Sequence, residues 1–284
     1  MTYTAATRAA LAHALAAPDV VLVSETAGLP GSFTEGLEGW LVAVPSGDRG
    51  ATAFAIGLAI AGQRVVLELP SAAHLAKVAD ELAEAAQLAD SEHRLTVVVT
   101  VAYGGELPPF DRPLGRALPP TDGLQVVCAS SPELAAGLLL HGLERAGVTV
   151  VLQPRALGRS RAQVSMEARA PAPRVIREGS HITLAAWGAG VDAALDAAEA
   201  LARDGISAGV VDLVALQPLD LELLGAQVRH TGRLVVAHPE DDVLAAQVRA
   251  VGLDAAFLHL ESPLAQVEAE SSRIARAARD AVHY

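Results

Sequence analysis

Apolar residues gather along the chain in short runs, with longer alanine-rich segments between them. In the first part, strands are predicted at DVVLVS (19–24), WLVAV (40–44), RVVLEL (64–69), LTVVVTVA (95–102), LQVVCA (124–129) and VTVVLQ (148–153). In the second part they are predicted at ITLAA (182–186), AGVVDL (208–213), RLVVAH (233–238) and AAFLHL (255–260). Most runs are continuous rather than alternating, which is typical of a parallel sheet covered by helices on both faces.

The segments between these runs predict helices, among them 4–17, 72–88, 132–146 and 191–204. Strands that alternate with helices in this way predict a doubly wound α/β fold. The segment GRSRAQVSMEARAPAPRVIREGS has little apolar periodicity and two close prolines, so it reads as a linker. We therefore expect a first domain at 1–157, a linker at 158–178 and a second domain at 179–284.

Composition narrows the class of protein. The formal net charge is −12 and no Lys/Arg run is present, which argues against nucleic-acid binding. The single cysteine, Cys128, lies in an apolar run and is interpreted as a core residue. No secretory signal and no uncharged apolar stretch of membrane-spanning length is present, so we expect a soluble, cytoplasmic protein.

Several common catalytic and nucleotide-binding motifs are absent. The chain has no GxxxxGK[ST] loop, no GxGxxG after the first predicted strand and no GxSxG. Its nine histidines include no HExxH or HxH pair, so we expect no metal site built by this chain alone.

The stretch VPSGDRGATAFAIGLAIAG (44–62) holds the first candidate chemistry. A strand ends there, and Asp48 lies in the turn before a helix of small residues. This places a carboxylate at the end of the sheet where α/β proteins bind ligands, although Asp48 could also serve only as a helix cap. The glycines within the helix predict close contact with another backbone, inside the fold or across a subunit interface.

A second carboxylate, Glu25, follows the first predicted strand. Because the carboxyl ends of neighbouring parallel strands share one edge, Glu25 and Asp48 could face one crevice and support proton transfer. A solvated loop glutamate is the alternative.

Four segments together resemble the β subunits of 2-oxoacid dehydrogenase E1 components. They are SETAGLPGSFTEGLEG, GDRGATAFAIGLAIAGQRVVLEL, REGSHITLAAWGAGVDAALDAAEALARDGISAGVVDLVALQPLD and TGRLVVAHPE, in the family's order. The resemblance implies a transketolase-like pyrimidine-binding domain followed by a transketolase C-terminal-like domain. It also implies thiamine diphosphate and Mg²⁺ shared with an α-type subunit that holds the diphosphate, in an α2β2 heterotetramer with β–β self-association.

The resemblance also assigns residues. Asp48 aligns with the family's glutamate, which hydrogen-bonds N1′ of the aminopyrimidine and promotes deprotonation of the thiazolium C2. Asp is one methylene shorter than Glu. Glu25 matches a second acidic position and is a relay or positioning candidate. Gly47, Ser71 and His74 are assigned with Asp48 to the cofactor, with His74 where the family has an aromatic-rich segment.

Tyr103, Phe110 and Arg112 are the substrate candidates. The family's histidine after the YGGG-like turn is missing here, and a guanidinium nearby suits an anionic substrate.

The altered segments favour a split thiamine-diphosphate enzyme that transfers an acyl or two-carbon ketol unit from a 2-oxoacid or ketose. A non-catalytic scaffold subunit and a standard E1 β subunit are the alternatives.

Overall fold

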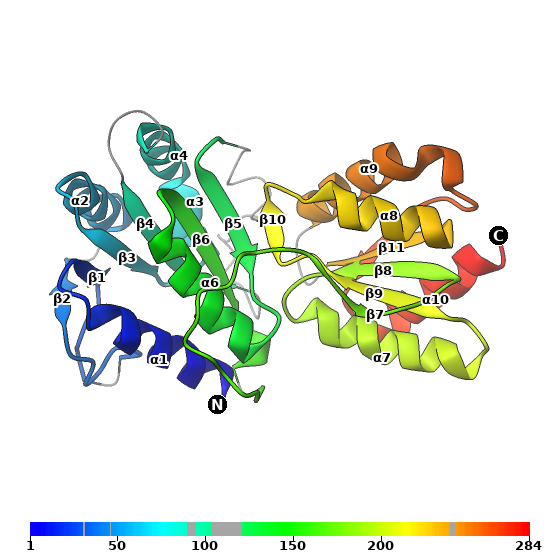
Figure 1. Cartoon of the computed structure of the whole chain (residues 1–284), viewed down its shortest axis with the longest axis horizontal. Coiled ribbons are helices and arrows are strands. Elements are labelled where there is room, and N and C mark those ends of the chain that lie inside the picture. Colours follow the sequence, from blue (N-terminus) through cyan, green and yellow to red (C-terminus); the bar gives the residue numbers. More distant parts are fainter. Residues whose placement is uncertain (31, 46, 90–94, 104–120, 159, 239–241) are drawn as a thin grey trace. The chain divides into compact units, whose positions relative to one another are not determined.

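The computed structural model describes residues 1–30, 32–45, 47–89, 95–103, 121–158, 160–238 and 242–284 (Figure 1). Within these residues the chain divides into two compact units, Met1–Pro171 and Ala172–Tyr284. Each unit is built on a mainly parallel sheet with helices on both faces, which confirms the predicted α/β, doubly wound fold class.

The first unit has its strands at the predicted apolar runs. Their bounds are β1 (Val20–Ser24), β2 (Trp40–Ala43), β3 (Arg64–Leu69), β4 (Thr96–Tyr103), β5 (Leu124–Cys128) and β6 (Gly147–Pro154). They lie in the order β5-β6-β4-β3-β1-β2, and every pair among them is parallel. Strand β1 therefore lies between β2 and β3. Cys128 is buried at the end of β5, as expected of a core residue.

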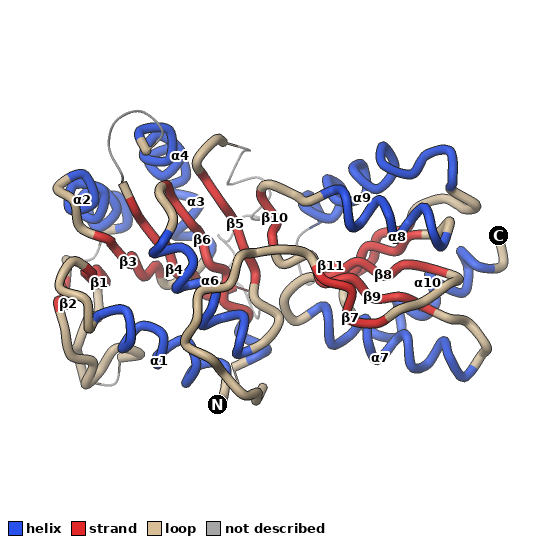
Figure 2. Tube along the Cα trace, viewed as in Figure 1, coloured by secondary structure: helices blue, strands red, loops and turns tan. Residues whose placement is uncertain are grey.

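The helices of the first unit form two layers. Their bounds are α1 (Tyr3–Leu15), α2 (Asp48–Ile60), α3 (Ala72–Lys77), α4 (Ala79–Leu88) and α6 (Pro132–Glu144), with a short 3₁₀ turn at Arg155–Leu157. Helices α1 and α6 pack against each other, whereas α2 contacts α3 and α4 on the other face (Figure 2). The single helix predicted at 72–88 is two helices, which meet at Val78.

The second unit repeats the plan on a smaller scale. Its strands are β7 (Arg174–Arg177), β8 (Ile182–Ala186), β9 (Ala208–Asp212), β10 (Ala215–Gln217), β11 (Leu234–His238) and β12 (Ala265–Glu268). Its sheet has the order β12-β11-β8-β9-β7, in which only β7 is antiparallel to its neighbour. Helices α7 (Gly190–Arg203) and α10 (Ser271–Val282) pack together, as do α8 (Leu221–Thr231) and α9 (Asp242–Ala256). Asp220 caps α8, because its Oδ1 accepts from the Glu222 N–H at 3.0 Å.

One predicted strand is wrong. The run AAFLHL forms the end of α9 and a 3₁₀ turn at Phe257–His259, with Leu258 90% exposed. The edge strand that pairs with β11 is instead β12, whose sequence AQVE has a weak apolar signal. An edge strand buries few side chains, so its sequence need not be strongly apolar.

The range 158–178, which the sequence assigns to a linker, includes strand β7 at its end. Arg174–Arg177 pair antiparallel with β9. Only Val175 and Ile176 are apolar there, which is too short a pattern to predict a strand. The division into 1–157, 158–178 and 179–284 stays a prediction.

No helix in the described ranges has the length and apolar character needed to cross a lipid bilayer.

Candidate active site

Three neighbouring strands of the first unit end beside the predicted site residues. Strands β1, β2 and β3 are adjacent and parallel, so their carboxyl ends share one edge of the sheet. Glu25 follows β1, Asp48 follows β2 and Ser71 follows β3. This is the edge at which open α/β sheets bind ligands.

Asp48 is the first residue of α2, and its carboxylate does not cap the helix. The N-cap residue is Gly47, and no side chain makes a capping hydrogen bond there. The Asp48 side chain is only 12% exposed, and its Oδ2 lies 2.9 Å from the ammonium Nζ of Lys77. The helix dipole favours negative charge at this position. The simple capping role left open by the sequence is therefore wrong.

Glu25 contacts the turn that leads into α2. Its Oε1 accepts a hydrogen bond from the backbone N–H of Gly47 at 3.0 Å. The side chain at the end of β1 thus holds the residue that immediately precedes Asp48. This contact supports the positioning role among the two predicted for Glu25.

Ser71 follows β3, and His74 contacts Asp48 from helix α3. The Oγ of Ser71 is 2.9 Å from Nδ1 of His74, and Nε2 of the same ring is 3.9 Å from Oδ1 of Asp48. The imidazole is thus held by Ser71 with one nitrogen directed toward the carboxylate. Five predicted residues from three segments of the chain form one connected group, which consists of Glu25, Gly47, Asp48, Ser71 and His74.

The sequence does not predict three further residues near this edge, which are Ser24, Glu68 and Lys77. Lys77 pairs with Asp48, and the Ser24 hydroxyl donates to Oε2 of Glu68 at 2.7 Å. Lys77 carries a signal in the sequence, because it is the sole lysine among the 21 basic residues of the chain. It also follows His74 by three positions, which puts both side chains on one face of α3.

The substrate candidates are placed only in part. Tyr103 ends β4, the neighbour of β3, so its backbone lies at the same edge of the sheet. Phe110 and Arg112 lie outside the described residues. In the described ranges, no group of three or more His, Cys, Asp or Glu side chains could hold a metal ion.

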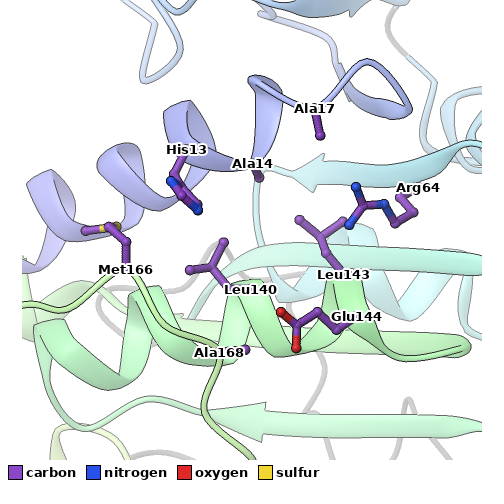
Figure 3. Close-up of a pocket in the computed structure, with 9 residues that line it drawn as sticks. All are labelled: His13, Ala14, Ala17, Arg64, Leu140, Leu143, Glu144, Met166 and Ala168. Carbon is purple, nitrogen blue, oxygen red and sulfur yellow. The ribbon is translucent and has the colours of Figure 1, made fainter.

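A cavity of about 210 Å³ lies elsewhere in the first unit, between α1 and α6 (Figure 3). Its walls come from α1, the turn after α1, α6, the start of β3 and an extended segment; they are His13, Ala14, Ala17, Arg64, Leu140, Leu143, Glu144, Met166 and Ala168. Arg64 already donates to both carboxylate oxygens of Asp19, at 2.7 and 2.8 Å, which lowers the pKa of Asp19. Arg64 begins β3 whereas Ser71 follows its end, so the cavity is separate from the Asp48 group.

Comparisons with known proteins agree with this architecture. Residues 172–283 match the family model of the transketolase C-terminal domain. A solved split-gene transketolase, described as an inactive β4 tetramer, has the same fold with a TM-score of 0.78 and 20% identity, over 100% of this chain and 98% of that chain.

Curated relatives extend the similarity across both units. The pyruvate dehydrogenase E1 β subunit of Staphylococcus epidermidis is 34% identical over 277 residues, which cover 89% of this chain and 85% of the relative. The mitochondrial 2-oxoisovalerate dehydrogenase β subunit of Dictyostelium discoideum is 30% identical over 242 residues, which cover 78% of this chain and 64% of the relative. The chain belongs to the family of 2-oxoacid dehydrogenase E1 β subunits.

Proposed function

We propose that this chain is the pyrimidine-domain subunit of a split thiamine-diphosphate enzyme, and that Asp48 is the carboxylate that binds the cofactor's aminopyrimidine. The observation that carries the proposal is the burial and position of the Asp48 carboxylate. It is a nearly buried carboxylate at the carboxyl edge of a parallel sheet, and it has no capping role. Its position follows from the fold shared with E1 β subunits.

The described residues fit one end of the cofactor. A carboxyl group can share a proton with a pyrimidine ring nitrogen in one hydrogen bond, and Asp48 presents such a group at the helix N-terminus. The added Cβ of a residue at Gly47 would meet nothing within 4 Å, so the backbone there leaves room for a ligand. His74 supplies the only ring among the residues assigned to the pyrimidine. When bound, the cofactor would supply a carbanion-forming thiazolium.

The other end of the cofactor is assigned to a partner. The similarity to E1 β subunits is what supports assigning Mg²⁺ and the diphosphate to an α-type subunit. The chain would then be incomplete alone and would work in an α2β2 heterotetramer. The inactive β4 tetramer of the split-gene transketolase supports self-association of subunits of this kind.

The chain's own residues would act by positioning and proton transfer. Glu25 holds the turn at Gly47, which fixes where α2 begins and so where the Asp48 carboxylate lies. Asp48 would share a proton with the pyrimidine nitrogen, with the His74 ring beside it. Asp is shorter than Glu by one methylene, and a misplacement near 1 Å can cost about 10²-fold in rate. The shorter acid therefore requires neighbours that hold it firmly.

The reaction would transfer an acyl or two-carbon ketol unit from a 2-oxoacid or a ketose. The curated relatives are 2-oxoacid dehydrogenase subunits, which favours a 2-oxoacid donor. Tyr103, Phe110 and Arg112 remain the proposed substrate residues. A non-catalytic scaffold is not favoured, because the acid is retained in a connected group of polar side chains.

Co-purification with the protein encoded beside it tests this function. We expect the complex, but not the isolated chain, to bind thiamine diphosphate and Mg²⁺ in a calorimetric titration. Asp48→Ala should then abolish turnover, while CO₂ release identifies a 2-oxoacid donor and aldose release a ketose donor. Failure of the wild-type complex to bind the cofactor would sink the proposal, and full activity of Asp48→Ala would remove Asp48 from the mechanism.

A further inference from the structure

Lys77 is held from both ends by consecutive residues of α2. Its ammonium lies 2.9 Å from Oδ2 of Asp48, and its backbone carbonyl accepts from Nε of Arg49 at 3.3 Å. Arg49 also pairs with Glu81 of α4, at 3.2 Å. The first turn of α2 is thus joined to the junction of α3 and α4 through Lys77.

This arrangement contributes little to stability through its charges. The Lys77 side chain is 60% exposed, and exposed ion pairs typically contribute little to the free energy of folding. The effect of the pair on the Asp48 carboxylate is more consequential. That side chain is 12% exposed, and one of its two oxygens is engaged by the ammonium.

The two carboxylate oxygens of Asp48 therefore differ. Oδ2 is bound by Lys77 at 2.9 Å, whereas Oδ1 has the looser contact of 3.9 Å with Nε2 of His74. The His74 ring is itself held by Ser71. A ligand that donates a hydrogen bond to Asp48 would find Oδ1 the more accessible acceptor, in an orientation that Lys77 fixes.

We infer that Lys77 is a positioning residue, which binds Oδ2 of Asp48 so that Oδ1 is presented to the aminopyrimidine. The inference rests on the proposed function, because it concerns how the shorter acid is aimed at the cofactor. A short side chain cannot reach as far as a glutamate, so its carboxylate must be held in one orientation. Lys77 acts on Asp48 and does not touch the cofactor itself.

Because Lys77 is the sole lysine, its ammonium can be observed without interference. With ¹⁵N-lysine in this chain only, and an unlabelled partner, the complex has one labelled side-chain signal in NMR spectra. We expect Asp48→Asn to shift that signal in the isolated chain. We also expect the chemical shift of the wild-type Lys77 ammonium to stay at its value for the pair with Asp48 after thiamine diphosphate is added to the complex.

Kinetics of the complex test the role directly. Lys77→Met should lower kcat by about 10- to 100-fold, the range expected for a misplaced group, with little change in cofactor affinity. Lys77→Arg keeps a positive charge and should recover most of the loss. Arg273→Met, which removes an exposed cation in the second unit, serves as the control and should leave kcat unchanged.

The outcomes separate this inference from the function it rests on. A wild-type complex that binds no thiamine diphosphate contradicts both. An active wild type with an equally active Lys77→Met contradicts only the role of Lys77, as does a signal that Asp48→Asn leaves in place. Loss of the paired signal on cofactor binding would show that Lys77 blocks Asp48 rather than positions it.

Discussion

At the scale of residues, the site carboxylates are held by contacts with single groups from other segments. At the site, each charged side chain has a partner from a different segment: Glu25 with the Gly47 amide, and Asp48 with Lys77. The sequence predicts Asp48 and Glu25, because each follows a strand. It could not predict Lys77 as the partner, because the pairing depends on how α3 is oriented.

A buried carboxylate in the second unit provides a stability test. Asp212 is fully buried in β9 and pairs at 2.7 Å with Arg174, its register partner in β7. Arg174→Met removes the guanidinium and should lower the free energy of unfolding by about 2–3 kcal/mol, because the buried Asp212 carboxylate loses this ion pair. Arg273→Met, which breaks exposed pairs, should cost less than about 1 kcal/mol.

Urea unfolding can follow the second unit by itself. The chain has two tryptophans, Trp40 in the first unit and the fully buried Trp187 in the second. In a Trp40→Phe background, fluorescence therefore reports the surroundings of Trp187. Equal losses for Arg174→Met and Arg273→Met would refute the importance of burial for this pair.

His141 on α6 predicts a pH dependence. Burial, with the nearby charge of Arg145, lowers the pKa of His141 below its ordinary value of 6.5. As pH falls through 6.5, the unfolded chain binds a proton at this residue more readily than the folded chain does. His141 therefore lowers the free energy of unfolding as pH decreases there. His141→Gln should reduce the difference between urea midpoints at about pH 7.5 and about pH 5.5.

The exposed helical His230 is the matched control for that measurement. His230→Gln should leave the pH difference close to that of the wild type. If His141→Gln did the same, burial of His141 would not be a cause of the pH dependence.

At the scale of elements, the sequence predicts helix α2 but not how its glycines pack. Its glycines predicted close contact with another backbone, yet a Cβ added at Gly50 or Gly57 would meet nothing within 4 Å. Contact inside the fold is therefore wrong for these two positions. The exposed Phe54 and Ile60 of the same helix leave the subunit interface as the remaining prediction.

Two alanine substitutions at helical glycines should have opposite effects. Gly57→Ala fills open space and should stabilise the isolated chain by up to about 1 kcal/mol, because glycine disfavours helix. Gly142→Ala on α6 would bring a Cβ within 2.9 Å of Val98 and should destabilise by about 1–3 kcal/mol. Thermal unfolding compares the two, and a destabilising Gly57→Ala would mean that α2 is packed more closely than the structure shows.

For the whole molecule, the α/β class was predictable because buried parallel strands are continuous Val- and Leu-rich runs. Strands β7 and β12 were missed because they are edge strands with few apolar residues. The run AAFLHL predicts a strand because its apolar residues resemble a buried run, although Phe257 and Leu258 are exposed. The side chains that contact Asp48 and Glu25 are less predictable, since they come from segments that meet only in the fold.

In the proposed function, Asp48 activates the cofactor in a complex of this chain with an α-type subunit. The most direct measurement is the rate at which the C2 proton of bound thiamine diphosphate exchanges with deuterium, followed by NMR after acid quenching. Asp48→Asn should slow this exchange by about 10²-fold or more, whereas Asp80→Asn, in the first turn of α4, should not change it. An exchange rate in Asp48→Asn equal to that of the wild-type complex would contradict the account.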